Sequence, residues 1–182
     1  MNVEVRRLEV ALEADFWRLM KSEPFGWCYC SAWTVPSWDG WGDRTSEENM
    51  AVRERIFREG GHDGYLLFVD GSVAGWCQCR PRAGMAKLER QLVREGAPPA
   101  HAISCLMIRP EHRGRGLAHL FLGGILDDLR ARGVRRVEAY PKPGRHEDVN
   151  EVWTGPEPLF AKAGFREESR VSGRVVMVLE LG

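Results

Sequence analysis

Two arginines and two glycines stand together in the stretch Arg113-Gly114-Arg115-Gly116, directly before a segment that is amphipathic up to about Arg132. A helix N-terminus carries partial positive charge, and its first amides have no partner within the helix, so it suits a phosphate group. Glycines let the backbone approach a ligand closely, and arginines add positive charge. The apolar run Ile103–Ile108 precedes the loop and predicts a strand. These residues therefore predict a site for a phosphate or pyrophosphate.

This loop differs from two common phosphate-binding loops. A P-loop would continue with Gly-Lys-Ser/Thr, and a dinucleotide fingerprint needs a third glycine where His119 stands. The loop instead resembles the acyl-coenzyme A loop of the GNAT superfamily of N-acyltransferases, Arg/Gln-x-x-Gly-x-Gly/Ala, written here as Arg113-x-x-Gly116-x-Ala118. The C-terminal Leu159-Phe160-Ala161-Lys162-Ala163-Gly164-Phe165 resembles that family's Leu-Tyr-x-Lys-x-Gly-Phe element. The two motifs occur in the order that the family shows.

The resemblance implies an acyl-CoA-dependent N-acyltransferase of the α/β class. The expected GNAT fold is one domain over residues 1–182, with a central mixed, mostly antiparallel sheet that splays at the cofactor strand and helices on both faces. Acetyl-CoA is the expected acyl donor, and no metal cofactor is expected. The resemblance and the strand position imply these cofactor-binding residues: Leu106, Met107, Ile108, Arg113, Gly114, Arg115, Gly116, Leu117, Ala118 and Phe160.

Acyl transfer needs a neutral amine, a polarised thioester carbonyl and a proton for the departing thiolate. Glu138 lies in an otherwise apolar strand, where burial would raise its pKa toward that of a general base, although it could also be an exposed strand-end residue. The family's proton-donating tyrosine corresponds to Phe160, which has no proton to give. Tyr140, Cys105 or water could donate instead, or the thiolate could leave unaided. We predict Glu138 and Tyr140 as catalytic residues.

The segment Pro24–Arg44 holds four of the seven tryptophans. So long and aromatic a loop in a compact domain is usually functional, the alternative being that it only covers the core. Rigid rings with one polar atom suit a cleft for an organic acceptor, and this segment often forms the acceptor pocket in GNAT proteins. We therefore expect Trp27, Trp33 and Trp38 to bind a small-molecule amine. Acetylation of a protein lysine or N-terminus, and a non-catalytic acyl-CoA sensor, are the alternatives.

The elements that would position these residues follow from local patterns. Alternation predicts an edge strand at Val3–Leu8, and helical spacing predicts a first helix at Ala11–Met20. Asp70-Gly71 between two apolar runs predicts a hairpin. The paired Gly123-Gly124 inside the helix after the loop should cost about 1 kcal/mol each relative to alanine, which suggests close backbone packing. Further predictions are a capping box at Thr45 and Glu48, a strand at Val134–Tyr140 parallel to the cofactor strand, a short helix at Pro156–Ala163 and a final hairpin at Phe165–Leu181.

Composition argues against several other classes of protein. The formal net charge is zero, so we expect no nucleic-acid partner. No apolar run approaches the ~20 residues of a membrane span, and we expect a cytoplasmic protein without a membrane partner, as a monomer or homodimer. Five cysteines, an odd number, argue against a disulfide framework. Cys28/Cys30 and Cys77/Cys79 could form a four-thiolate zinc site, but we expect them to pack as small buried hydrophobes.

Overall fold

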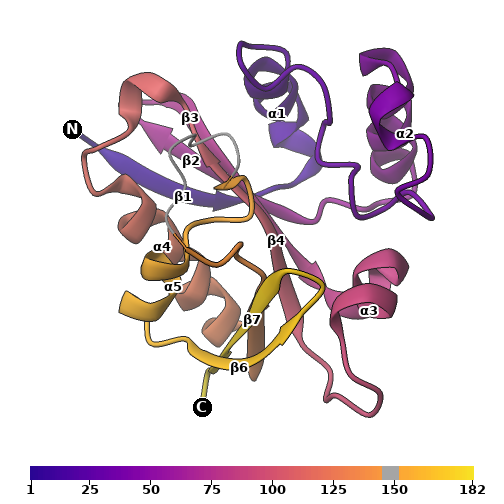
Figure 1. Ribbon diagram of the computed structural model, residues 1–182. Helices are drawn as coiled ribbons and strands as arrows, with labels where there is room; N and C mark the ends of the chain where they lie inside the picture. Colours follow the sequence, from indigo (N-terminus) through magenta and orange to yellow (C-terminus); the bar gives the residue numbers. More distant parts are fainter. Residues whose placement is uncertain (145–151) are drawn as a thin grey trace.

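The computed structural model describes residues 1–144 and 152–182, which form a seven-stranded sheet with helices on both faces (Figure 1). The strand order across the sheet is β1-β2-β3-β4-β5-β7-β6. The strands are β1 Val3–Arg7, β2 Gly64–Val69, β3 Ser72–Pro81, β4 His101–Ile108, β5 Arg136–Ala139, β6 Arg166–Val171 and β7 Arg174–Glu180. The helices are α1 Glu13–Met20, α2 Ser46–Arg58, α3 Ala86–Leu92, α4 Leu117–Ala131 and α5 Glu157–Lys162, and single 3₁₀ turns occupy Val10–Leu12, Trp41–Asp43, Arg82–Gly84 and Pro110–His112.

Strands β4 and β5 form the parallel pair of an otherwise antiparallel sheet, as the strand–helix–strand pattern predicts. Their pairing covers only His101–Ile103 against Val137–Ala139, although β4 continues to Ile108. At the point of separation β4 also carries a bulge, because Gln78 pairs with Cys105 and Cys79 with Ile103, which leaves Ser104 as an extra residue. The predicted splay at the cofactor strand is therefore confirmed.

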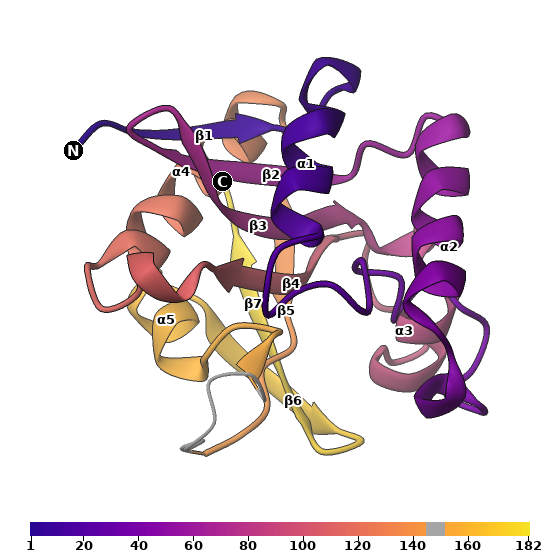
Figure 2. The ribbon, with the colours of Figure 1, turned by 90° about the horizontal axis from the view of Figure 1, so that it is seen from above.

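Two layers of helices enclose the sheet (Figure 2). One face packs against α4 and α5 around Phe121, Leu126 and Phe160. The opposite face packs against α1 and α2 around Phe16 and Trp76, and farther along against α3. This arrangement leaves the carboxyl end of β4 between the two layers, beside the start of α4. No helix in residues 1–144 and 152–182 has the length and apolar character that crossing a bilayer requires.

Local sequence signals account for most element boundaries. Thr45 and Glu48 form the predicted capping box at the start of α2. Asp70 and Gly71, both with positive φ, make the turn between β2 and β3. The expectation for the glycine pair in α4 holds for Gly124, where a Cβ would lie 2.7 Å from Val5 of β1. It fails for Gly123, where a Cβ would meet nothing within 4 Å.

Candidate active site

The loop before α4 joins the end of β4 to a helix N-terminus. Gly114 and Gly116 have φ of +73° and +76°, the left-handed region that glycine tolerates, and Gly116 is the N-cap of α4. A Cβ on either glycine would meet no protein atom within 4 Å, so the space above the loop is open. Arg113 Nε donates to the Ile108 carbonyl at 2.8 Å and ties the loop to β4. The unpartnered amides of the first turn of α4 therefore face open space, as an anion site requires.

One cavity of about 570 Å³ extends from this loop to the tryptophan-rich segment. It brings together many of the residues predicted to bind cofactor or acceptor: Trp27, Trp38, Leu106, Met107, Ile108, Arg113, Gly114, Gly116, Leu117 and Ala118. Of the predicted residues, Arg115, Trp33, Phe160, Glu138 and Tyr140 do not line it. Five more lining residues belong to the segment Pro24–Arg44 that was expected to form the acceptor pocket, namely Pro24, Phe25, Cys28, Ala32 and Trp41, and Cys105 was a candidate proton donor. Lining residues that the sequence did not indicate are His112, Val152, Trp153 and Pro156.

The gap between β4 and β5 is partly filled by the chain that returns from β5. The Leu106 N–H donates to the Trp153 carbonyl at 2.8 Å, so this amide, expected to bind the cofactor arm, already has a partner. Backbone groups alternate along a strand, and the N–H of Ile108 therefore faces the same side two residues farther on. The Arg109 N–H instead donates to Ala74 of β3. The exposed edge of β4 thus ends at Ile108, next to the glycine loop.

The tryptophan-rich segment forms an aromatic wall. The ring of Trp41 makes edge contacts with Trp27 and Trp38, with centroids 5.0 and 5.9 Å apart. Trp38 is held in place by its indole N–H, which donates to Gln91 of α3 at 2.7 Å. Trp33 lies behind this wall, only 3% exposed, and packs against Trp38 and Trp153. Its position is that of a supporting core residue.

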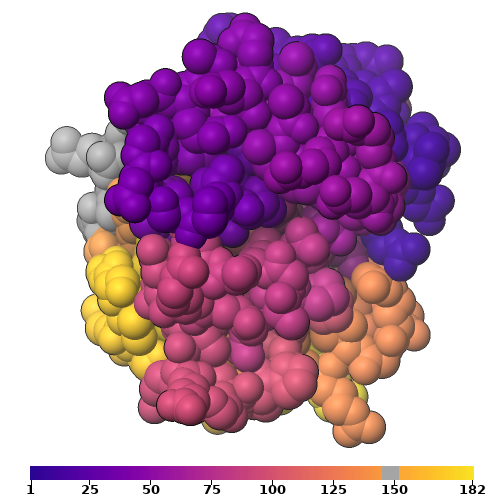
Figure 3. Space-filling model, turned by 90° about the vertical axis from the view of Figure 1, so that its right-hand side faces the viewer, coloured from indigo at the N-terminus to yellow at the C-terminus, as the bar shows by residue number. Residues whose placement is uncertain are grey.

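Helix α3 supports the wall from outside the cavity. Figure 3 shows the violet N-terminal region resting on the rose-coloured segment that contains α3. Lys87 of α3 is 1% exposed, and its Nζ lies 3.4 Å from the Trp38 ring centroid and 5.5 Å from that of Trp41. It also donates to the Ser37 carbonyl at 3.3 Å. Burial, together with nearby Arg90, lowers the pKa of Lys87 to about 8.

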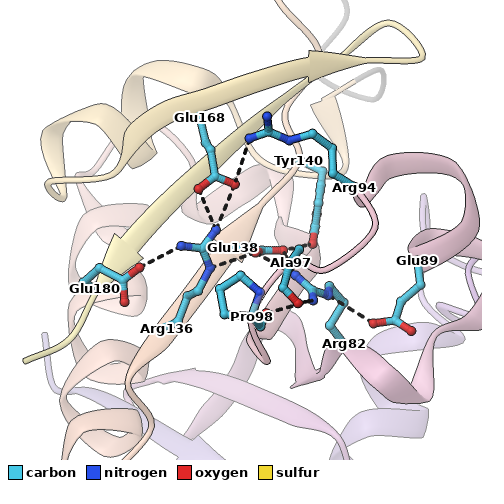
Figure 4. Close-up of polar contacts among 10 residues, drawn as sticks. All are labelled: Arg82, Glu89, Arg94, Ala97, Pro98, Arg136, Glu138, Tyr140, Glu168 and Glu180. Atoms are coloured by element: carbon cyan, nitrogen blue, oxygen red, sulfur yellow. Dashed lines mark hydrogen bonds and ion pairs between the residues drawn. The ribbon is translucent and has the colours of Figure 1, made fainter.

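Glu138 occupies an ion-pair network away from the cavity (Figure 4). Arg82 Nη1 donates to both carboxylate oxygens at 2.7 and 2.8 Å, and Arg136 Nε donates at 3.0 Å. The Tyr140 hydroxyl donates to the same carboxylate at 2.5 Å. Burial acts to raise the pKa of Glu138, but these hydrogen bonds outweigh it and the pKa is lowered. The expectation of a raised pKa is wrong, because the sequence did not show the two arginines.

Of the remaining predicted residues outside the cavity, Arg115 is exposed, whereas Tyr140 and Phe160 are buried. Tyr140 is fully buried, and burial together with the Glu138 charge raises the pKa of its hydroxyl, so it holds its proton against Glu138. Phe160 is fully buried too, with its ring centroid 5.4 Å from that of Phe165. A Cβ at Gly155 would lie 2.7 Å from the Phe160 ring, so the loop before α5 packs directly on it. Phe160 therefore belongs to the core under α5.

The cysteines fall into two groups. Cys77 and Cys79 lie in the core on one face of β3, the packing that their spacing predicts. Cys30 lies on the other face, where the Trp76 indole N–H donates to its Sγ at 3.0 Å, and burial raises the pKa of its thiol. Cys28 and Cys105 line the cavity, and their thiol pKa values are also raised. Across residues 1–144 and 152–182 no group of three or more histidine, cysteine or acidic side chains is arranged to hold a metal ion.

Comparison with known proteins agrees with this geometry. The model of the Acetyltransferase (GNAT) family matches residues 23–151, and the chain belongs to this family. It is thus an acyl-CoA-dependent N-acyltransferase of the GNAT type. No curated protein of known function matches the sequence.

Solved structures share the fold at low sequence identity. A protein described as a GNAT acetyltransferase from Desulfovibrio desulfuricans has a TM-score of 0.60 at 16% identity, with all of both chains covered. The paiA N-acetyltransferase from Thermoplasma acidophilum, in complex with coenzyme A, has a TM-score of 0.57 at 15% identity over 99% of both chains. The ribosomal-protein-S18-alanine N-acetyltransferase from Escherichia coli has a TM-score of 0.54 at 14% identity, over 100% of this chain and 95% of that one. Of these three descriptions, the last names an acceptor, a ribosomal protein, and a shared fold does not determine the acceptor of another chain.

Proposed function

We propose that the protein transfers an acetyl group from acetyl-CoA to the amine of a small molecule bound against the aromatic wall. One observation carries the proposal: a single cavity connects the glycine loop, the exposed edge of β4 and the rings of Trp27, Trp38 and Trp41. Donor and acceptor can therefore meet within one enclosed space. Apolar and aromatic lining with few polar groups is typical of sites for small organic ligands.

The donor half of the cavity suits coenzyme A. Its pyrophosphate would sit on the amides that open α4, with Arg113 beside them. The pantetheine arm would run along the open edge of β4 toward the bulge. Backbone amides on such an edge can stabilise the oxyanion that forms at the thioester carbonyl. The Ile108 N–H is the amide that faces this side, and Leu106 could join it only by giving up the Trp153 carbonyl.

The reaction can balance its protons without an acidic residue. The amine nitrogen attacks the thioester carbon, the C–S bond breaks, and the proton that the nitrogen loses ends on the sulfur of coenzyme A. A thiol of ordinary acidity is a fair leaving group near neutral pH. Cys28 and Cys105 have raised thiol pKa values, so they stay protonated and do not compete as nucleophiles. These features support direct transfer from donor to acceptor.

The proposal is tested by incubating the purified protein with acetyl-CoA and a panel of small amines, and by measuring release of the coenzyme A thiol and the acetylated product. At least one amine should give turnover above hydrolysis. A Lys- or N-terminal peptide panel is run alongside. Turnover with peptides and none with small amines would replace the small-molecule acceptor by a protein, and binding of acetyl-CoA without any turnover would indicate a sensor.

A further inference from the structure

The aromatic wall of the acceptor half already binds a cation. The Lys87 ammonium lies against the ring of Trp38, 3.4 Å from its centroid, and is within 5.5 Å of the Trp41 centroid. Trp38 and Trp41 line the cavity and Lys87 does not, so the rings stand between the ammonium and the space for the acceptor. Apart from the rings, the Ser37 carbonyl at 3.3 Å is the partner that the described residues give Lys87.

This arrangement changes what the wall attracts. The negative face of an indole ring usually draws cations, and a cluster of tryptophan rings lining a cavity would otherwise favour an ammonium acceptor. Here the rings of Trp38 and Trp41 already interact with one positive charge, that of Lys87. Two unit charges about 8 Å apart repel by about 2 kcal/mol at an effective dielectric constant of about 20. A second ammonium against the cavity side of Trp38 is therefore disfavoured.

The rest of the described cavity wall does not offset the positive charge of Lys87. The arginine that lines it, Arg113, is also positive, and the other titratable lining groups are the His112 imidazole and the thiols of Cys28 and Cys105. Among the described lining residues none is an aspartate or glutamate. The acceptor half itself is apolar, with Phe25 and Ala32 beside the tryptophans. An uncharged ring fits this environment, whereas the described lining residues offer an alkylammonium group no carboxylate as a counter-ion.

We propose that the acceptors of this enzyme are aromatic amines taken up in their neutral form, with amines that are weak bases, such as ring-attached amines, preferred over alkylammonium compounds. The proposal rests on the proposed function and adds the substrate class to it. Neutral uptake also fits the chemistry, because the neutral amine is the nucleophile. Lys87 acts in this scheme as a positioning residue that works through Trp38.

Binding of two unreactive ligands tests the charge preference without turnover. Benzyltrimethylammonium and its uncharged carbon isostere neopentylbenzene have nearly the same shape, and their affinities for the coenzyme A-saturated protein can be measured by tryptophan fluorescence. Hydration alone favours the uncharged ligand, so the decisive quantity is the change in the affinity ratio between variants. Lys87→Met should shift the ratio toward the cation by about 30-fold, the factor that corresponds to about 2 kcal/mol of repulsion. Lys87→Arg should keep the wild-type ratio.

Lys21→Met is the matched control, because Lys21 also lies over a tryptophan, with Nζ 5.6 Å from the Trp17 centroid, but neither residue lines the cavity. It should leave the ratio unchanged. If Lys87→Met lowers the melting temperature too far, Lys87→Gln removes the same charge. An equal ratio in the wild type and in folded Lys87 variants without the charge overturns the proposal.

A turnover arm separates this inference from the proposed function. Aniline and benzylamine are compared as acceptors at pH 7, where the first is neutral and the second is an ammonium. Removing the Lys87 charge should raise kcat/KM for benzylamine relative to aniline. If no amine of the panel causes release of coenzyme A from acetyl-CoA, the proposed function is wrong and so is the proposed substrate class. If amines are acetylated but the aniline-to-benzylamine ratio does not respond to Lys87, only the substrate class is overturned.

Discussion

Two buried charges in this molecule are handled in opposite ways. Glu138 receives hydrogen bonds from two arginines and a tyrosine, so its charge is fully compensated. Lys87 has one carbonyl partner and otherwise the faces of aromatic rings. The first arrangement holds β5 to its neighbours and leaves no group available for chemistry. The second leaves a net positive charge behind the cavity wall, where it can act on a ligand. Both groups are buried, and they differ in how far their charge is compensated. We infer that this compensation, more than burial, decides whether an ionisable group of this protein has a structural or a functional role.

The largest effect on stability should come from breaking the compensated network. Glu138→Gln removes the charged partner that Arg82 and Arg136 share, although Arg82 keeps Glu89 and Arg136 keeps Glu168 and Glu180. Loss of one member of a buried ion pair typically costs about 3–5 kcal/mol, and the remaining carboxylates should hold the loss to the lower part of this range. Urea unfolding should show this loss, while the coenzyme A affinity of the folded protein stays the same. Glu167→Gln, which removes an exposed partner of Arg170, is the control and should hardly change stability. An unchanged midpoint for Glu138→Gln would contradict the structural role.

The glycine loop should respond in binding. Gly116→Val places a branched side chain over the anion site, on a residue with φ of +76°, and should weaken acetyl-CoA binding by about 100-fold through loss of several phosphate hydrogen bonds. Calorimetry gives the affinity. Gly123→Ala is the control within α4, since its Cβ would enter open space and should leave the affinity unchanged. If the folded Gly116→Val variant binds acetyl-CoA with wild-type affinity, the loop is not part of the cofactor site.

The aromatic wall should affect the acceptor alone. Trp38→Ala removes a lining ring that carries the Lys87 contact, and we expect a loss of about ten-fold in kcat/KM for the acceptor with little change in acetyl-CoA affinity. Trp33→Phe, behind the wall, keeps most of the packing and should leave acceptor kinetics nearly unchanged. If Trp38→Ala instead weakens acetyl-CoA binding and leaves the acceptor kinetics unaltered, Trp38 contacts the cofactor and not the acceptor.

The smallest effects, on the order of 1 kcal/mol, should appear as two separate limbs in the pH dependence of stability, one acidic and one alkaline, and stability rises with pH along both. The lowered pKa of Glu138 means that its contribution is present above about pH 4.5 and is lost as the pH falls through the folded-state pKa. Lys87 acts at higher pH, because its pKa falls from 10.5 to about 8 on folding. The unfolded chain then holds more protons between these values, so stability should rise with pH across that window. Plots of melting temperature against pH should lack the acidic limb in Glu138→Gln and the alkaline limb in Lys87→Met. Retention of both limbs in either variant would contradict the assignment.

The sequence predicted the fold because each element carries its own local signal. The capping box at Thr45, the Asp70-Gly71 turn and the glycine loop before α4 all depend on neighbours within a few residues. Gly116 accordingly stands at the predicted start of α4, and it lines the cavity. The direction of the Glu138 pKa was predicted wrongly because its main partner, Arg82, is far away in the chain, and only the folded sheet brings them together. Lys87 gave no signal at all, since a lysine in a short helix is usually a solvated residue.

The extra residue in β4 also changes the phase of the strand. Before the bulge, Ile103 packs toward α4; after it, Leu106 and Ile108 do, while Cys105 and Met107 face the α1 layer. Odd and even positions thus exchange sides at Ser104. Deleting this single residue would turn Cys105 and Met107 toward α4 and interchange every contact of the cavity edge, whatever side chains were present. The edge of the cavity therefore depends on whether β4 has an odd or an even number of residues, as well as on its composition.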